Sequence, residues 1–240
     1  MRRLATLGLT FALAAAPAAA WAPETRVRMV DEAIRLMPAS LRLVLERQRE
    51  QVRRGMLLPL TDEDAAAHKP ASSGGTLPGQ LEEETRQLAA ALARGTEFRD
   101  IAERLGRVAH FVADAGFPPG ASAQGSPRYR HFAGFCESRR EKFPLVFYGH
   151  DDADLARGDV RAFVTHVAAR AAQEDTHLAR AYAAAGSPPD PAAFDDRSVP
   201  FAVGSLCYSR SINDMVRLWL WAWRQAGGDA GRTPYAKARP

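Results

Sequence analysis

The chain contains 240 residues, of which 46% are hydrophobic and 25% are charged, and its formal net charge is +4 at neutral pH. This length is sufficient for one large domain or two small ones with a substantial core. The charges are too nearly balanced to predict binding to nucleic acid or to membranes from bulk charge alone.

The first twenty residues have the layout of a secretory signal peptide. Arg2 and Arg3 precede a short apolar run over residues 4–16, and three alanines ending at Ala20 form a small-residue cleavage site. The run is shorter than the ~20 apolar residues of a membrane-spanning helix. We therefore expect a chain exported to the periplasm or the exterior, which begins at Trp21 and contains no membrane span. The alternative is an uncleaved N-terminal anchor.

Apolar residues recur with helical spacing through most of the remaining chain. Predicted helices cover residues 24–37, 41–54, 80–94, 97–115, 129–141, 160–185 and 203–225. Gly55, Gly95 and Gly227 are predicted to end three of these helices. Residues 143–149 are aromatic and β-prone, but no neighbouring segment offers a partner strand, so we expect an extended loop. The prediction is an all-α fold with one helical domain over residues 21–228 and a disordered tail over residues 229–240.

The longest predicted loop, residues 56–79, carries three side chains that commonly bind metals. Asp62, Asp64 and His68 lie on it, and loops of this length in compact domains are usually functional or disordered. Carboxylate and imidazole groups are suitable metal ligands, although solvated loops commonly contain them.

Two further features suggest metal binding. His110 and Asp114 are four residues apart on a predicted helix and share one face, so they could bind one Zn²⁺ ion or form a simple hydrogen bond. Cleavage before Trp21 would expose an α-amino group with a pKa near ~7.7, which a metal can deprotonate. The alternative for Trp21 is an ordinary aromatic anchor.

The cysteines and the C-terminal tryptophans each allow two interpretations. Export permits a disulfide between Cys136 and Cys207, but two buried free thiols fit the sequence equally well. The Trp-rich run at residues 218–223 lacks a developed basic face, so we expect it to pack in the core rather than on a membrane surface.

The order of these features resembles the zinc-dependent phospholipase C family and the single-strand nucleases that share its fold. The resemblance rests on Trp21 after the signal, the segment 26–34, the Asp- and His-bearing loop, the segment Leu-Gly-Arg-Val-Ala-His-Phe-Val-Ala-Asp at 105–114, and the segment 207–214 before the Trp-rich helix. The segment 105–114 and the Trp start are its most specific parts.

The resemblance implies a helical fold with three zinc ions in a cleft. It assigns Trp21, His68, His110 and Asp114 as metal ligands. It assigns Asp62 or Asp64 as the loop ligand, which is also the candidate base for the attacking water.

The sequence departs from the family pattern at several ligand positions. Arg26 stands where the family has a histidine, and a permanent cation cannot ligate a metal. No histidine follows in residues 116–120, and His131 and Glu137 are six residues apart rather than four. We therefore expect one zinc ion rather than three, with Arg26 as a candidate to bind an anionic phosphate.

These observations favour an exported metal-dependent hydrolase of phosphate esters, acting on phospholipid or nucleic-acid phosphodiesters. The alternative is a non-catalytic relative that keeps the helical scaffold with at most one structural metal.

Overall fold

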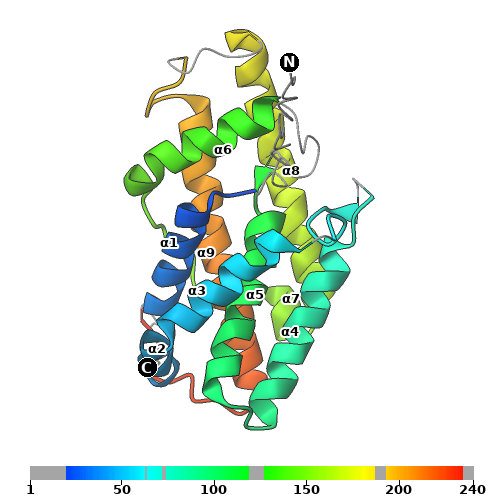
Figure 1. Ribbon diagram of the computed structural model, residues 1–240, viewed down its shortest axis with the longest axis vertical. Helices are drawn as coiled ribbons and strands as arrows, with labels where there is room; N and C mark the ends of the chain where they lie inside the picture. Colours follow the sequence, from blue (N-terminus) through cyan, green and yellow to red (C-terminus); the bar gives the residue numbers. More distant parts are fainter. Residues whose placement is uncertain (1–19, 63, 72–73, 119–126, 187–192, 235–240) are drawn as a thin grey trace, which may run out of the picture.

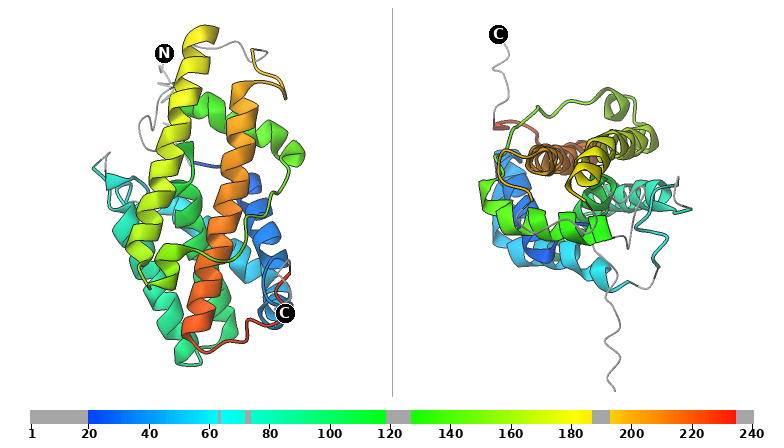
Figure 2. Two further views of the ribbon diagram at one scale, coloured as in Figure 1. Left: turned by 180° about the vertical axis from the view of Figure 1, so that it is seen from behind. Right: turned by 90° about the horizontal axis from the view of Figure 1, so that it is seen from above.

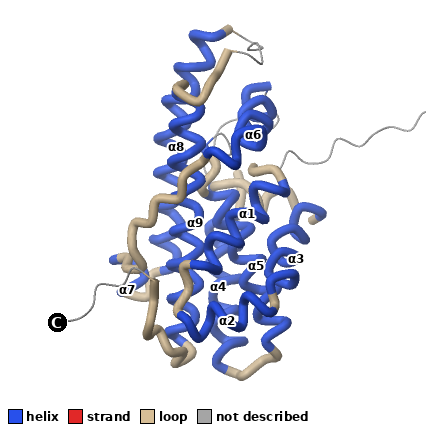
Figure 3. The backbone as a smooth tube through the Cα atoms, turned by 90° about the vertical axis from the view of Figure 1, so that its left-hand side faces the viewer, coloured by secondary structure: helices blue, strands red, loops and turns tan. Residues whose placement is uncertain are grey.

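The computed structural model describes residues 20–62, 64–71, 74–118, 127–186 and 193–234. Every regular element among these residues is a helix (Figure 1, Figure 3), which confirms the predicted all-α class. The α-helices are α1 (Pro23–Arg35), α2 (Ala39–Arg47), α3 (Arg49–Leu57), α4 (Leu77–Ala93), α5 (Phe98–Ala115), α6 (Pro127–Arg139), α7 (Ala153–Ala156), α8 (Val160–Ala185) and α9 (Val199–Gln225). Two 3₁₀ turns, η1 (Leu58–Thr61) and η4 (Arg140–Lys142), complete the described elements. The predicted signal peptide, apart from Ala20, lies outside the described residues.

Helix α5 lies at the centre of the molecule. It packs against α3, α4, α8 and α9, while the long helices α8 and α9 run side by side (Figure 2, left) and α6 crosses near their upper ends. All eight residues from Val108 to Ala115 are buried, so the second half of α5 is enclosed on every side. A polar side chain in this stretch must therefore find its partners within the protein.

The crossing of α3 and α5 explains why Gly55 does not end a helix as predicted. Helix α3 continues through Gly55 to Leu57. A Cβ at Gly55 would lie 1.9 Å from the Glu103 carbonyl oxygen, and one at Gly106 would lie 2.1 Å from the Val52 carbonyl oxygen. The two glycines thus allow the helix backbones to touch. Gly95 and Gly227 have positive φ after α4 and α9, which confirms them as helix stops.

Other boundaries also differ from the prediction. The helix expected over residues 41–54 is divided into α2 and α3 at Gln48, whose φ of −105° and ψ of 21° interrupt the helical geometry. Helix α9 begins at Val199, four residues earlier than expected, because Pro200 fits the first turn, where no backbone N–H is needed. The short helix α7 was not predicted, and the Asp152 side chain caps it.

Residues 144–149, here called the strap, confirm the predicted extended loop. They cross α9 (Figure 2, left), whose Ser209, Asn213 and Arg217 are spaced four apart on one face. Ser209 and Asn213 each accept one backbone N–H of the strap and donate to one of its carbonyls, and Arg217 donates to a third. Side chains of α9 thus replace the missing partner strand.

The tryptophans of α9 pack inward, as predicted. Trp219 is fully buried and its Nε1 donates to the Leu105 carbonyl at 2.9 Å, while Trp221 and Trp223 pack against the core. Within the described part of the chain, no helix combines the length and the apolar character that a membrane span requires.

The remaining expectations concern the cysteines and the tail. Cys136 and Cys207 are free and buried, and burial raises the pKa of both thiols. In the predicted tail, the Asp229 carbonyl accepts hydrogen bonds from Ser40 and Trp223, and residues 235–240 lie outside the described structure.

Candidate metal centre

His110 and Asp114 project from one face of α5, as their spacing predicts. The same face carries Gly106 one turn earlier, at the close crossing with α3. That crossing brings the Met56 carbonyl, next to Gly55 in the chain, to 2.8 Å from His110 Nδ1. The glycine pair therefore places the backbone group that orients His110.

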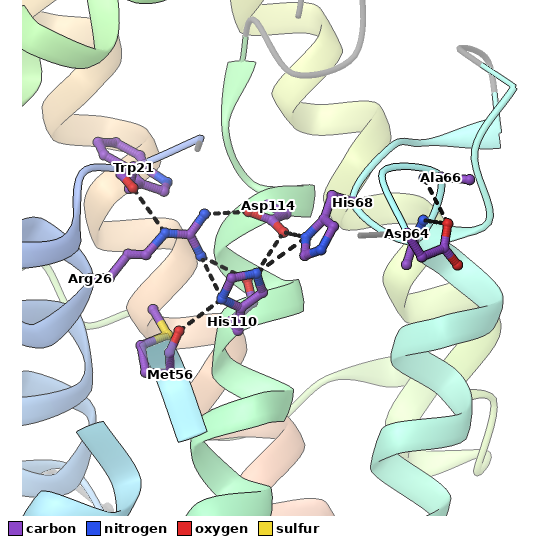
Figure 4. A network of polar contacts seen from close by, with 9 residues as sticks. Trp21, Arg26, Met56, Asp64, Ala66, His68, His110 and Asp114 are labelled. Atoms are coloured by element: carbon purple, nitrogen blue, oxygen red, sulfur yellow. Dashed lines mark hydrogen bonds and ion pairs between the residues drawn. The ribbon is translucent and has the colours of Figure 1, made fainter. Parts of the chain in front are cut away.

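His68 joins this pair from the loop between α3 and α4 (Figure 4). Its Nδ1 lies 2.7 Å from Asp114 Oδ2 and 3.2 Å from His110 Nε2, and the latter lies 3.1 Å from Asp114 Oδ2. Zinc–ligand bonds of about 2 Å in a tetrahedron separate neighbouring ligand atoms by about 3.3 Å. The three atoms therefore have the spacing of ligands on one ion, and we call these residues the His–His–Asp cluster.

The surroundings of His110 determine its tautomer. Nδ1 faces the Met56 carbonyl, which can only accept, so Nδ1 carries the proton. Arg26 Nη1, 3.2 Å from the same nitrogen, can then donate only to the His110 carbonyl, at 3.3 Å. Nε2 is left with a lone pair directed at the cluster. A carbonyl that orients a ligating histidine in this way is typical of metal sites.

His110 and Asp114 are in ligand-competent protonation states at neutral pH. Burial lowers the pKa of His110 and thus favours the neutral ring. Burial alone would raise the pKa of Asp114, but the Arg26 guanidinium, together with His110 and His68, holds it well below its usual value. A neutral imidazole and an ionised carboxylate are the forms that bind metals.

Arg26 lies beside the cluster and is fully buried. Its Nη2 donates to Asp114 Oδ1, and its Nε donates to the Trp21 carbonyl at 2.9 Å (Figure 4). Asp114 therefore directs one carboxylate oxygen to Arg26 and the other to His68 and His110. Because the nitrogens of Arg26 face protein acceptors, the described contacts place Arg26 as a support of Asp114.

Trp21 and the two loop carboxylates lie outside the His–His–Asp cluster. Trp21 is buried against Phe117, and its backbone carbonyl is linked to the site through Arg26. Asp62 and Asp64 are exposed, and Asp64 turns away from His68 to accept the backbone N–H groups of Ala66 and Ala67 (Figure 4). Asp64 thus shapes the turn that precedes His68.

His131 and Glu137, whose spacing departs from the family pattern, contact other residues. His131 Nδ1 lies 2.8 Å from the Tyr182 hydroxyl, while Glu137 accepts a hydrogen bond from Thr25 and another from Arg140. Neither the Met56 carbonyl nor the pairing of Arg26 with Asp114 was predicted from the sequence. Gly55, next to Met56, was the one local indication of the carbonyl contact. The ion pair had no local indication, because Arg26 and Asp114 are 88 residues apart.

Comparisons with known proteins support the fold. No protein-family model matches the sequence, and no characterised protein matches it in a sequence search. The structure is similar to alpha-toxin from an avian strain of Clostridium perfringens, with 13% identity, a TM-score of 0.65, and 85% of this chain and 64% of the toxin covered. It is also similar to alpha toxin from Clostridium absonum, with 16% identity, the same TM-score, and 89% and 65% covered. This chain thus spans slightly less than two thirds of each toxin, and the likeness confirms the predicted fold.

Proposed function

We propose that the chain binds one zinc ion at the His–His–Asp cluster and hydrolyses phosphate esters there. The observation that carries the proposal is the convergence of three ligand atoms from His68, His110 and Asp114. The fold likeness to clostridial alpha-toxins agrees with the sequence resemblance to zinc-dependent phospholipases C. Phospholipids and nucleic acids are the substrate classes that this resemblance favours.

The donor set fits a catalytic rather than a closed structural zinc site. Structural zinc ions usually have four protein ligands, whereas catalytic ones have three and an open position. The cluster supplies three, and the His68 side chain is 19% exposed while those of His110 and Asp114 are nearly inaccessible. The open side therefore lies toward His68, where water and a phosphate ester would enter.

A zinc ion held there would supply Lewis-acid chemistry, which activates water at neutral pH and polarises a phosphoryl oxygen. The protein residues hold and orient this centre. His110 is fixed by the Met56 carbonyl, and Asp114 is fixed by Arg26. Of the two loop carboxylates, Asp62 is the better proposal for the base that takes the proton from water, because Asp64 already accepts two backbone hydrogen bonds.

The second candidate function is a non-catalytic scaffold with one structural metal. The complete burial of His110 and the ion pair that occupies one oxygen of Asp114 favour it. It predicts metal binding without turnover, so an assay of activity separates the two functions.

The assay measures hydrolysis of bis(p-nitrophenyl) phosphate by the zinc-loaded mature chain. We expect turnover that a chelator abolishes and zinc restores, and that His110→Ala eliminates. His177→Ala removes an exposed histidine of α8 outside the cluster and is the matched control. Bound zinc without turnover would favour the structural alternative.

A further inference from the structure

A groove of about 250 Å³ lies between α8, α9 and the strap, and it shares no residue with the His–His–Asp cluster. We call it the arginine groove. Its lining residues are Tyr148, Arg170, Arg210, Asn213, Asp214 and Arg217. Three come from the segment 207–214 that the sequence analysis singled out, and the proposed metal site uses none of them.

Asp214 holds two of the three arginines in place. It is buried in α9, and its Oδ2 accepts from Arg170 Nη2 of α8 at 2.8 Å while its Oδ1 accepts from Arg217 Nη1 at 3.3 Å. Burial raises the pKa of Asp214 to about 6, although both guanidiniums act to lower it. Asp214 is therefore ionised at neutral pH, and the two guanidiniums are ordered before any ligand arrives.

Arg210 supplies the third guanidinium. It lies one helical turn before Asp214, and its Nη1 donates to Glu174 of α8 at 2.9 Å. Counting Glu174, which pairs with Arg210 although it does not line the groove, three positive charges stand against two negative charges. The groove therefore has a net positive lining although the whole chain is nearly neutral.

All three arginines retain unused donors, and Arg170 and Arg210 are accessible to solvent. A guanidinium has five N–H groups. Among the described residues, Arg170 and Arg210 each donate one hydrogen bond and Arg217 donates two, and the buried Nε of Arg170 has no hydrogen-bond partner. The side chains of Arg170 and Arg210 are 36% and 33% exposed. An anion that enters from solvent can therefore reach both.

We propose that the arginine groove binds a phosphate group, as a second anion site separate from the His–His–Asp cluster. A carboxylate has two oxygens and can be held by one guanidinium, whereas three guanidiniums match the several oxygens and double charge of a phosphate. Tyr148, which is 47% exposed at the edge of the groove, provides an apolar surface for an organic group attached to the phosphate. The phosphate belongs either to a soluble molecule or to a lipid headgroup.

The test compares three probes on the mature chain: inorganic phosphate and glycerol 3-phosphate by calorimetry, and phosphatidylcholine vesicles with or without phosphatidic acid by co-sedimentation. Arg210→Gln is the test variant, because replacing Arg170 or Arg217 would remove a hydrogen-bond donor from the buried Asp214 carboxylate. Arg180→Gln, which removes an exposed arginine of the neighbouring helix α8 outside the groove, is the matched control. His110→Ala removes a ligand of the metal cluster and thereby separates the two sites.

We expect at least one probe to bind saturably, with affinity reduced roughly tenfold or more by Arg210→Gln. Arg180→Gln and His110→Ala should leave that affinity unchanged. Binding of the soluble probes identifies a soluble phosphate as the ligand, whereas binding only to vesicles with phosphatidic acid identifies a lipid headgroup. The proposal is overturned if no probe binds, if Arg210→Gln and Arg180→Gln have equal effects, or if His110→Ala abolishes binding.

Discussion

Arg26 and Asp114, 88 residues apart in the chain, form a buried ion pair beside the His–His–Asp cluster. Their side chains are 0% and 4% exposed, so neither charge can be solvated by water if the other is removed. The pair leaves one carboxylate oxygen for His68 and His110. The stability of the fold and the geometry of the candidate metal site therefore depend on the same contact.

The first prediction concerns this ion pair. Arg26→Met or Asp114→Asn should each destabilise the metal-free protein by about 3–5 kcal/mol, because each leaves one buried charge without its partner. The double variant Arg26→Met/Asp114→Asn should lose much less than the sum of the two single losses. Urea unfolding of the four proteins measures these differences, and additive losses would show that the pair is not coupled.

The second prediction concerns the crossing of α3 and α5. Gly106→Ala should destabilise the protein by about 1–3 kcal/mol, because the new Cβ would meet backbone atoms of Val52 and Met56, which cannot move aside independently. Gly134→Ala, on the exposed side of α6 with nothing within 4 Å, should instead stabilise by roughly 0.5–1 kcal/mol. Equal thermal unfolding temperatures for the two variants would contradict the close crossing.

The third prediction concerns the strap. Asn213→Leu removes three hydrogen bonds, two to the strap and one to the Ser209 carbonyl, and should destabilise the protein by about 1–3 kcal/mol. Backbone amide exchange at Tyr148 should accelerate in this variant, since Asn213 Oδ1 accepts that N–H. Unchanged exchange at this position would mean that the strap is held by other contacts.

The fourth prediction concerns pH. Burial raises the pKa of Asp214 from 3.8 to about 6, so between these values the folded protein holds a proton that the unfolded chain has lost. The contribution of Asp214 to the free energy of unfolding should therefore fall as pH rises from about 4 to 6 and stay constant above that. Asp214→Asn should lack this change. Parallel pH profiles of stability for the two proteins would exclude the raised pKa.

The sequence predicted the helices well where apolar periodicity was long and uninterrupted, as in α5 and α8. It failed at Gly55 because a glycine that ends a helix and a glycine that lets two helices touch look the same locally. The strap was correctly predicted as an extended loop, but Ser209, Asn213 and Arg217 were not recognised as its partners, since they contact it across more than 60 residues.

The candidate site was predictable only in part, for a similar reason. The four-residue spacing of His110 and Asp114 fixes their shared face on any helix. His68 was assigned to the site through the family resemblance, and the structure places it in contact with both. The partner of Arg26 could not be identified, because it depends on how α1 packs against α5. Nothing in the local sequence distinguishes a buried guanidinium from an exposed one.

The most direct test of the account is the zinc content of protein exported through its own signal, measured by elemental analysis beside His110→Ala and Asp114→Ala. His177→Ala serves as the control for loss of a histidine outside the cluster. We predict one zinc ion per chain in the wild type and the control, and none in the two cluster variants. No zinc in the wild type, or zinc retained in both cluster variants, would contradict the proposed metal site.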